Sequence, residues 1–141
     1  MNAPAYDPNN IFAKILRKEA PCHFVCEDED TFVFMDIMPR SDGHTLVIPK
    51  QPARNILDVP QGVLVPLIQM TQKVAIAAKE AFGADGVTVT QFSEAAGGQL
   101  VFHLHFHVIP RYEGVALRSA GVMGDSALLA AHAEKLKAAM G

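Results

Sequence analysis

Hydrophobic and polar positions repeat with two different spacings along this chain, and each spacing predicts one kind of element. Apolar residues three or four positions apart predict a helix. This spacing occurs in residues 11–19, from about 58 to 83, and from about 125 to 140. Apolar runs or strict alternation between turn residues predict strands. These patterns occur in residues 22–26, 31–37, 44–49, 87–92 and 99–109.

Residues that favour helix ends stand at the borders of the helical segments. Asn9 or Asn10 can cap the first helix. The long helix is expected to begin near Asp58, with Gln61 three residues later as a capping-box partner. Gly83 stands where many helices end on a left-handed glycine, so the long helix is expected to end there.

The predicted elements follow the order helix, three strands, helix, two strands, helix. Consecutive strands joined by short turns favour antiparallel neighbours, and strands do not alternate with helices. We therefore expect an α+β fold with a mostly antiparallel five-stranded sheet, one long helix and shorter terminal helices. No repeat or low-complexity linker divides the sequence, so one domain is expected over residues 1–141.

Charge and composition argue against two classes of partner. The 141 residues are 50% hydrophobic with a net charge of −3, and the 12 Lys and Arg residues are scattered. A nucleic acid polymer is therefore not an expected partner. The most apolar run, residues 63–78, is interrupted by proline and polar residues, and the first ten residues lack the features of a targeting peptide. We expect no membrane association and a cytoplasmic protein.

The sequence HLHFHVI places three of the six histidines at every second position. In a strand, alternate side chains share a face, so His103, His105 and His107 are expected on one face and the apolar residues between them on the other. Imidazole can ligate a metal, transfer a proton near neutral pH or act as a nucleophile. The spacing alone does not choose among these three.

A metal centre is not the favoured interpretation of the histidines. A closed zinc site usually needs four ligands, and two histidines two residues apart supply only half of them. His44 and distant carboxylates are the remaining candidates. We therefore expect neither a bound metal nor another cofactor.

Five motifs, in this order along the chain, resemble the histidine triad (HIT) superfamily. They are IFAKI (11–15), FMDIMP (34–39), GHTLVIPK (43–50), AAGGQ (95–99) and HLHFHVI (103–109). The most similar branch is that of the histidine triad nucleotide-binding, or Hint-like, proteins. The resemblance covers about residues 10–113 and leaves a C-terminal helical tail of about residues 125–140 outside it.

This resemblance implies a HIT-like fold and a homodimer that binds a purine nucleotide or a nucleoside phosphoramidate. It implies a nucleotide hydrolase of the phosphoramidase type, which cleaves the bond between the α-phosphate and its leaving group. The cleavage proceeds through a covalent nucleotidyl-histidine. A neutral imidazole suits that role because it is a good nucleophile at pH 7 and departs readily afterwards.

Four histidines match catalytic positions of the family. His105 resembles the nucleophile, and His107 resembles the residue that contacts the phosphate and assists the departing group. His103 resembles the residue that supports the nucleophile mainly through its backbone. His44 resembles a fourth histidine that hydrogen-bonds into the set, although a plain turn residue is the alternative at this position.

The resemblance also implies a nucleotide-binding set: Asp36, Ile37, Phe12, Phe34, Gly98 and Gln99. Asp36 resembles the carboxylate that binds the ribose hydroxyls, and the three apolar residues resemble the walls of the base site. The backbone N–H groups of Gly97 and Gly98 can approach a phosphate, although glycines in a loop between strands are common without any ligand. The structural alternatives are an aspartate that caps the turn after its strand and phenylalanines that pack in the core.

Three departures from the family pattern affect the expected chemistry. Residues 10–13 lack the Cys-x-x-Cys of zinc-binding relatives, Ser93-Glu94 replaces Asn-Gly, and Leu100 replaces a Ser or Thr that donates to the leaving group. Two other functions therefore stay open. One is a nucleotide-binding or scaffold dimer with weak or lost catalysis, and the other is a nucleotidyl transferase that uses the same residues.

Overall fold

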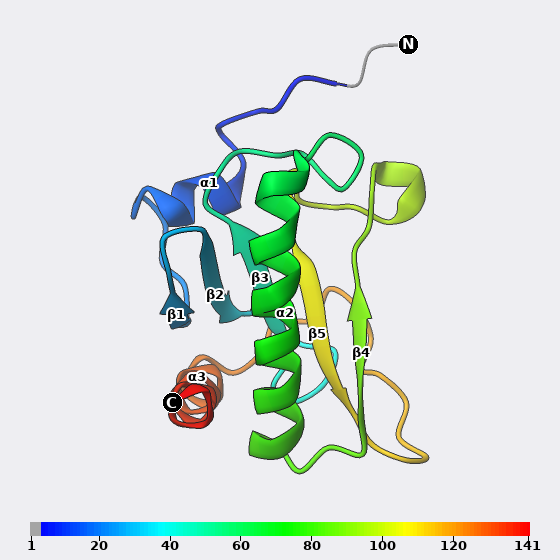
Figure 1. Cartoon of the computed structure of the whole chain (residues 1–141). Helices are drawn as coiled ribbons and strands as arrows, with labels where there is room; N and C mark the ends of the chain where they lie inside the picture. Colours follow the sequence, from blue (N-terminus) through cyan, green and yellow to red (C-terminus); the bar gives the residue numbers. More distant parts are fainter. Residues whose placement is uncertain (1–3) are drawn as a thin grey trace.

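Five antiparallel strands form one open sheet in the computed structural model, which describes residues 4–141 (Figure 1). The strands are β1 (Phe24–Glu27), β2 (Thr31–Met35), β3 (Thr45–Pro49), β4 (Gly86–Thr90) and β5 (Phe106–Arg111). Their order across the sheet is β1-β2-β3-β5-β4, so β5 lies between β3 and β4. The α+β fold with a five-stranded antiparallel sheet is confirmed.

Three α-helices accompany the sheet: α1 (Ile11–Leu16), α2 (Gln61–Ala81) and α3 (Ser126–Met140). Two of them begin with a side-chain cap, and the cap of α1 is one that the sequence predicts. Asn10 Oδ1 accepts the N–H of Ala13 at 2.9 Å, and Asp125 Oδ1 accepts the N–H of Leu128 at 2.9 Å. Gly83 follows α2 with φ +57°, a left-handed conformation that glycine adopts without steric cost.

The predicted start of the long helix at Asp58 is wrong. The helix begins at Gln61, because the Asp58 carboxylate is used in the turn before it, where it accepts the backbone N–H groups of Arg54 and Asn55 at 3.0 Å. Pro60 is the residue that precedes the first helical turn. The capping-box pair of Asp58 and Gln61 therefore does not form.

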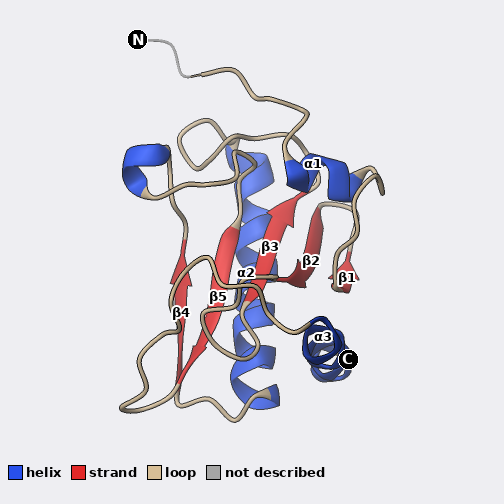
Figure 2. Ribbon diagram, turned by 180° about the vertical axis from the view of Figure 1, so that it is seen from behind, coloured by secondary structure: helices blue, strands red, loops and turns tan. Residues whose placement is uncertain are grey.

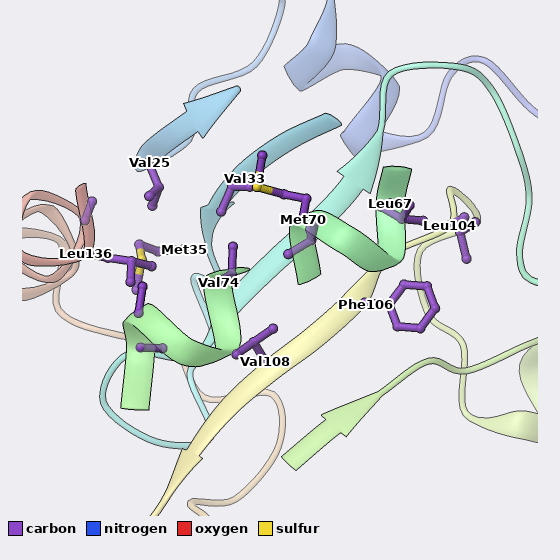
Figure 3. Packing of buried hydrophobic residues seen from close by; sticks show 14 of the residues in the cluster. Val25, Val33, Met35, Leu67, Met70, Val74, Leu104, Phe106, Val108 and Leu136 are labelled. Carbon is purple, nitrogen blue, oxygen red and sulfur yellow. The ribbon is translucent and has the colours of Figure 1, made fainter. Parts of the chain in front are cut away.

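Alternate residues of the central strands bury into two separate cores on opposite faces of the sheet. One face packs against α2 and α3, which supply Leu67, Val74 and Leu136 to a cluster with Val33 and Val47 (Figure 3). Figure 1 shows α2 lying across this face of the sheet, and Figure 2 shows the opposite face, which α2 does not cover. On that opposite face α1 packs on the residues one position out of phase with the first set, which are Phe32, Phe34, Leu46 and Ile48.

The predicted strand of residues 99–109 is largely wrong in its first half, because β5 begins only at Phe106. Its pairing with β3 runs from Thr45 opposite Val108 to Val47 opposite Phe106. Beyond this point Pro49 has no N–H to extend the ladder. The N–H of Leu104 donates instead to the carbonyl of Ala53 at 2.8 Å. His103 and His105 therefore lie in irregular backbone, and only His107 belongs to a strand.

Over residues 4–141, no helix has the length and apolar character needed to cross a membrane. Both cysteines, Cys22 and Cys26, are free.

Candidate active site

The His105 ring is held by a hydrogen bond to the backbone of its own segment. Its Nδ1 lies 2.7 Å from the carbonyl oxygen of His103. A carbonyl can only accept, so Nδ1 carries the proton and Nε2 keeps a free lone pair. Burial lowers the pKa of His105 below its ordinary value, which keeps the ring neutral at pH 7. This tautomer and charge are those required of an imidazole nucleophile at Nε2.

His103 is completely buried, and both of its ring nitrogens have partners. Nε2 lies 2.8 Å from the carbonyl of Pro49, and Nδ1 lies 2.6 Å from the hydroxyl of Tyr6. Burial lowers the pKa of His103 to about 4. A neutral and fully bonded ring cannot react, so His103 supports His105 through its backbone carbonyl, as the family resemblance implies.

His44 and His107 form a hydrogen-bonded pair whose proton positions follow from the backbone. The N–H of Arg40 donates to Nδ1 of His44 at 2.9 Å, so the proton of the neutral His44 ring lies on Nε2. That Nε2 is 2.9 Å from Nδ1 of His107, which therefore accepts. Burial lowers the pKa of His44 to about 4 and that of His107 to about 3. The remaining proton of neutral His107 must then lie on Nε2, where it is a donor.

The three rings that carry this chemistry are close together. His105 and His107 have ring centroids 4.9 Å apart, and His44 and His107 are 5.2 Å apart. His105 thus presents a lone pair on Nε2, and the adjacent His107 presents a proton on its own Nε2. We call the set of His44, His103, His105 and His107 the histidine cluster.

Asp36 lies beside the histidine cluster, a contact that the sequence did not predict. Its Oδ2 is 3.3 Å from Nε2 of His44 and 3.8 Å from Nδ1 of His107, while Oδ1 accepts the N–H of Met38 at 2.8 Å. The last bond is the turn cap expected as the structural alternative. Burial raises the pKa of Asp36 to about 6, so the carboxylate is mostly ionised at pH 7.

Two of the predicted base-site residues are buried in the core under α1. Phe12 is 8% exposed and Phe34 is 3% exposed, and their ring centroids are 5.3 Å apart. Phe12 also packs edge to face on His105, at 4.9 Å between centroids. Ile37 follows Asp36 and is 44% exposed. Of the three apolar residues, Ile37 therefore has the most surface free for a ligand.

Gln99 has a structural role, contrary to its expected nucleotide contact. Its side-chain oxygen accepts from Asn55 Nδ2 at 3.1 Å and from the N–H of Glu94 at 2.8 Å, and its Nε2 donates to the carbonyl of Arg54 at 2.8 Å. Arg54 and Asn55 also bond the Glu94 carboxylate, at 2.8 and 2.6 Å. We call these four residues the Gln99 cluster.

Gly98 is likewise engaged within its own turn. Its N–H donates to the carbonyl of Ala95 at 3.0 Å, in the short 3₁₀ turn η1 (Ala95–Gly97). With φ +98° it adopts a conformation that favours glycine, and a Cβ there would lie 3.3 Å from the Phe92 ring. The expected approach of this N–H to a phosphate would need the turn to open.

Comparisons with known proteins identify the family to which this arrangement belongs. The family model of the HIT domain matches residues 17–114. The chain belongs to the HIT family. A solved HIT-like protein from Bartonella henselae, described as involved in cell-cycle regulation, is 53% identical with a TM-score of 0.93, over 96% of this chain and 99% of the other.

Two further HIT relatives carry more specific names. A solved protein from Sulfolobus tokodaii, described as a hypothetical histidine triad nucleotide-binding protein, is 30% identical with a TM-score of 0.85, over 92% of this chain and 90% of the other. Adenylylsulfatase HINT3 of Arabidopsis thaliana is 35% identical over 73% of this chain, but the match spans only 52% of that relative. The HIT-like fold is thus shown both by similarity and by the structure.

One group of side chains in this HIT protein has the spacing of metal ligands but not the required proton positions. Ligand atoms of Asp36, His44 and His107 lie within 4.8 Å of one another. Ligation through Nε2 of His44 would need a proton on Nδ1, and that nitrogen faces the N–H of Arg40. The Nδ1–H of His44 and the backbone N–H of Arg40 would then point at each other. This trio therefore does not fit a metal ion.

Tyr6 and Arg40 are site residues that the sequence did not reveal. Tyr6 bonds a histidine 97 positions away, and Arg40 acts through its backbone N–H. Neither contact has a spacing or residue pattern that marks it. Leu100, where relatives carry a hydroxyl residue, has no side-chain donor, and because it is 87% exposed it contributes little packing.

Proposed function

We propose that this HIT protein binds a purine nucleotide and hydrolyses the bond between its α-phosphate and a leaving group. One observation carries the proposal, namely the opposite proton positions on adjacent rings. His105 has its proton on Nδ1 and a lone pair on Nε2, whereas His107 has its proton on Nε2. A nucleophile and a proton donor thus lie side by side, at 4.9 Å between ring centroids.

In the first step, Nε2 of His105 attacks the α-phosphorus, a P–N bond to His105 forms, and the bond to the leaving group breaks. The negative phosphate favours a proton on His107. Protonated His107 gives its Nε2 proton to the leaving group. A proton on Nδ1 of His107 would oppose the Nε2–H of His44 at 2.9 Å, so this step requires both N–H groups to turn toward Asp36 Oδ2, which lies 3.8 Å from Nδ1 of His107 and 3.3 Å from Nε2 of His44. Asp36 accordingly stabilises the charged form of His107.

In the second step, water attacks the phosphorus, His107 takes the proton of the water, and the P–N bond to His105 breaks. The products are the nucleoside monophosphate and the free enzyme. The Nδ1–H of His105 remains on the carbonyl of His103 throughout, which favours the positive charge of the phosphorylated ring. A route through a covalent intermediate replaces one difficult displacement by two easier ones.

The nucleoside is proposed to lie along Ile37 and the edge of the Phe12–Phe34 pair, with the ribose hydroxyls near Asp36. This placement is supported by the exposure of Ile37 and by the contact of Phe12 with His105. It puts the base beside apolar side chains and the sugar beside a carboxylate that is 16% exposed. The Asp36 carboxylate would therefore be shared between ribose and histidines.

The leaving group is proposed to be one that departs easily. Leu100 provides no donor at the position where relatives carry a hydroxyl, so a strongly basic amine would receive a proton only from His107. The relative named adenylylsulfatase supports a weakly basic leaving group of the sulfate type. Adenylyl sulfate and aryl phosphoramidates of adenosine are accordingly the first substrates to test.

The test measures release of AMP from an aryl phosphoramidate of adenosine and from adenylyl sulfate by the purified protein. Mass spectrometry of a quenched reaction, kept away from acid, should find a nucleotidyl group on the peptide that contains His105. Binding without AMP release and without an adduct would favour a nucleotide-binding protein that lacks catalysis. An adduct that water does not discharge, but an added acceptor does, would favour a nucleotidyl transferase.

We also propose a homodimer that forms through α2. Three large apolar residues of this helix remain exposed in the single chain: Val65 at 52%, Ile68 at 44% and Ile76 at 64%. Burial of such residues favours association. Light scattering coupled to size exclusion should give twice the chain mass of 15.2 kDa, and Ile76→Glu should return the protein to the monomer.

A further inference from the structure

The hydroxyl of Tyr6 reaches the histidine cluster from a part of the chain outside the HIT domain match. Tyr6 Oη lies 2.6 Å from Nδ1 of His103, and the two rings pack edge to face with centroids 5.6 Å apart. The match to the family model begins at residue 17. The contact therefore belongs to a segment that the family motifs do not include.

Two hydrogen bonds hold the turn that follows Tyr6, residues 7–10, against helix α1. Asn10 Nδ2 donates to the carbonyl of Asp7 at 2.8 Å, and Arg17 Nη1 donates to the carbonyl of Pro8 at 2.8 Å. These bonds hold residues 7–10 against the start and end of α1. Tyr6 comes directly before this anchored turn, so the backbone next to it is held in place while its ring contacts His103.

Tyr6 must be the donor in its bond to His103. The Nε2 proton of His103 donates to the carbonyl of Pro49 at 2.8 Å, so Nδ1 of the neutral ring is bare and can only accept. Burial raises the pKa of Tyr6, which keeps its hydroxyl protonated. The His103 ring thus has one tautomer that satisfies both partners, and Tyr6 fixes it from the side that faces the N-terminal segment.

His103 is linked to the proposed nucleophile, His105, through its backbone carbonyl. The carbonyl of His103 accepts from Nδ1 of His105 at 2.7 Å, and the N–H of Leu104, in the same peptide plane, donates to Ala53 at 2.8 Å. That peptide orients the His105 ring. A His103 side chain that turned or took up water at Nδ1 would shift this peptide, and with it the direction of the His105 lone pair.

We propose that Tyr6 is a positioning residue that holds the His103 ring in place and, through the carbonyl of His103, keeps the His105 ring in its reactive orientation. The inference rests on the proposed function for its kinetic readout. It assigns no chemical step to Tyr6, because the hydroxyl contacts a buried histidine and not a reacting atom.

The test compares Tyr6→Phe with Tyr112→Phe. Tyr112 is the matched control, since its hydroxyl donates to the carbonyl of Phe82 at 2.7 Å, a backbone bond outside the histidine cluster. Tyr6→Phe should lower kcat about three- to tenfold, the effect of one hydrogen bond, with KM within about twofold. Tyr112→Phe should keep the wild-type kcat. Equal kcat values in the two variants would overturn the positioning role.

A second readout needs no substrate. With ¹⁵N-labelled histidine, Tyr6→Phe should move the Nδ1 resonance of His103 toward that of an unbonded imidazole nitrogen and also shift the nitrogens of His105. Tyr112→Phe should leave both unchanged. If the wild-type protein proves inactive, the proposed function fails, and these spectra then decide alone. Unchanged His105 resonances in Tyr6→Phe overturn the inference whatever the rate.

Discussion

The Gln99 cluster and the histidine cluster are both buried polar networks, but they differ in what they leave open. In the Gln99 cluster, Asn55 is 1% exposed and Gln99 is 2% exposed, and the amide oxygen and nitrogen of Gln99 are both bonded within the protein. In the histidine cluster, Nε2 of His105 and Nε2 of His107 have no hydrogen-bond partner among residues 4–141.

The comparison distinguishes residues that stabilise the fold from residues that can react with a ligand. The criterion is whether each buried polar atom already has a hydrogen-bond partner within the protein. A buried group that has all its partners stabilises the fold and has nothing left for a ligand. A histidine that is held through one nitrogen presents the other in a fixed direction and protonation state. By this criterion we expect His103 to support the fold, whereas His105 and His107 are the residues proposed to react.

The largest expected effect is that of His105→Ala on turnover. The substitution removes the atom that forms the bond to phosphorus, so kcat should fall by more than about a thousandfold. Nucleotide affinity should change by less than about threefold, because little ground-state binding is lost. Steady-state rates and calorimetric titration with AMP measure the two quantities. His23→Ala, a half-buried histidine outside the cluster, is the control. Full activity in His105→Ala would exclude the nucleophile assignment.

A substitution in the Gln99 cluster should lower the stability of the protein and leave its turnover nearly unchanged. Gln99→Ala leaves the buried amide of Asn55 and the N–H of Glu94 each short of a partner, so the free energy of unfolding should fall by about 2–4 kcal/mol. The kcat of the folded molecules should stay within about threefold of wild type. Urea unfolding checks the first value, with the exposed Gln51→Ala as control. A stable but inactive Gln99→Ala would instead place this side chain in the reaction.

Asp36 sharpens the comparison because it contacts both a turn and the histidines. Asp36→Ala should weaken ribonucleotides by about 1.5–3 kcal/mol, the contribution of a hydrogen bond to a charged acceptor. Analogues without 2′ and 3′ hydroxyls should be affected much less. Titrations with both nucleotide classes measure the difference. Equal losses would mean that the carboxylate acts only through Met38, His44 and His107.

The pH dependence of stability tests the protonation states directly. His44 and His103 have pKa values lowered to about 4 and His107 to about 3, so the unfolded chain binds more protons than the native protein below the ordinary value of 6.5. These three histidines therefore make stability rise with pH between about 4 and 6.5, and their contribution is lost as pH falls through the folded pKa values. Asp36 has a pKa raised from 3.8 to about 6 and acts in the opposite direction over most of that range.

Asp36→Asn removes the opposing contribution and should steepen the rise by up to about 1.4 kcal/mol per pH unit, the value for one proton. Urea unfolding at pH 4.5, 5.5 and 6.5 provides the slopes. An unchanged slope in Asp36→Asn would show that the carboxylate has its ordinary pKa in the native protein.

The smallest expected effect is that of Leu100→Ser. A hydroxyl at this position should raise kcat/KM for alkyl phosphoramidates about tenfold, if one hydrogen bond of about 1.4 kcal/mol is gained in the transition state. Adenylyl sulfate should gain less, because its leaving group needs no proton. Because Leu100 is 87% exposed, stability should be unaffected. No gain in a folded variant would mean that residue 100 does not face the leaving group.

Much of the fold follows from local patterns in the sequence. The alternation of Leu104, Phe106 and Val108 correctly predicts their burial on one face. It cannot reveal where β5 begins, because that burial continues through residues whose backbone has already left the ladder. The break depends on Pro49 and Ala53, which lie about fifty residues earlier in the chain. A strand end that is set by residues far away in the chain cannot be predicted from the local sequence pattern.

The site was predictable where a residue type carries the chemistry and not where geometry does. Histidines at alternate positions, with His44 after a turn, indicate the cluster. The tautomers depend on three partners, the backbone N–H of Arg40 and the carbonyls of His103 and Pro49. All three are backbone groups, so the residue types do not reveal them. The hydrogen bonds of Gln99 could not be predicted for the same reason, since its partners are brought together only by the fold.

The position of β5 between β3 and β4 has a consequence for synthesis of the protein. When β3 has left the ribosome, its open edge has no partner until Phe106–Arg111 has also been made. At about 5–20 residues per second, that interval lasts on the order of several seconds. During this time the nascent chain exposes an apolar strand edge and lacks the histidine cluster, because His44 meets His107 only when the two strands pair. The unpaired edge of β3 can then pair with a strand of another chain until β5 covers it.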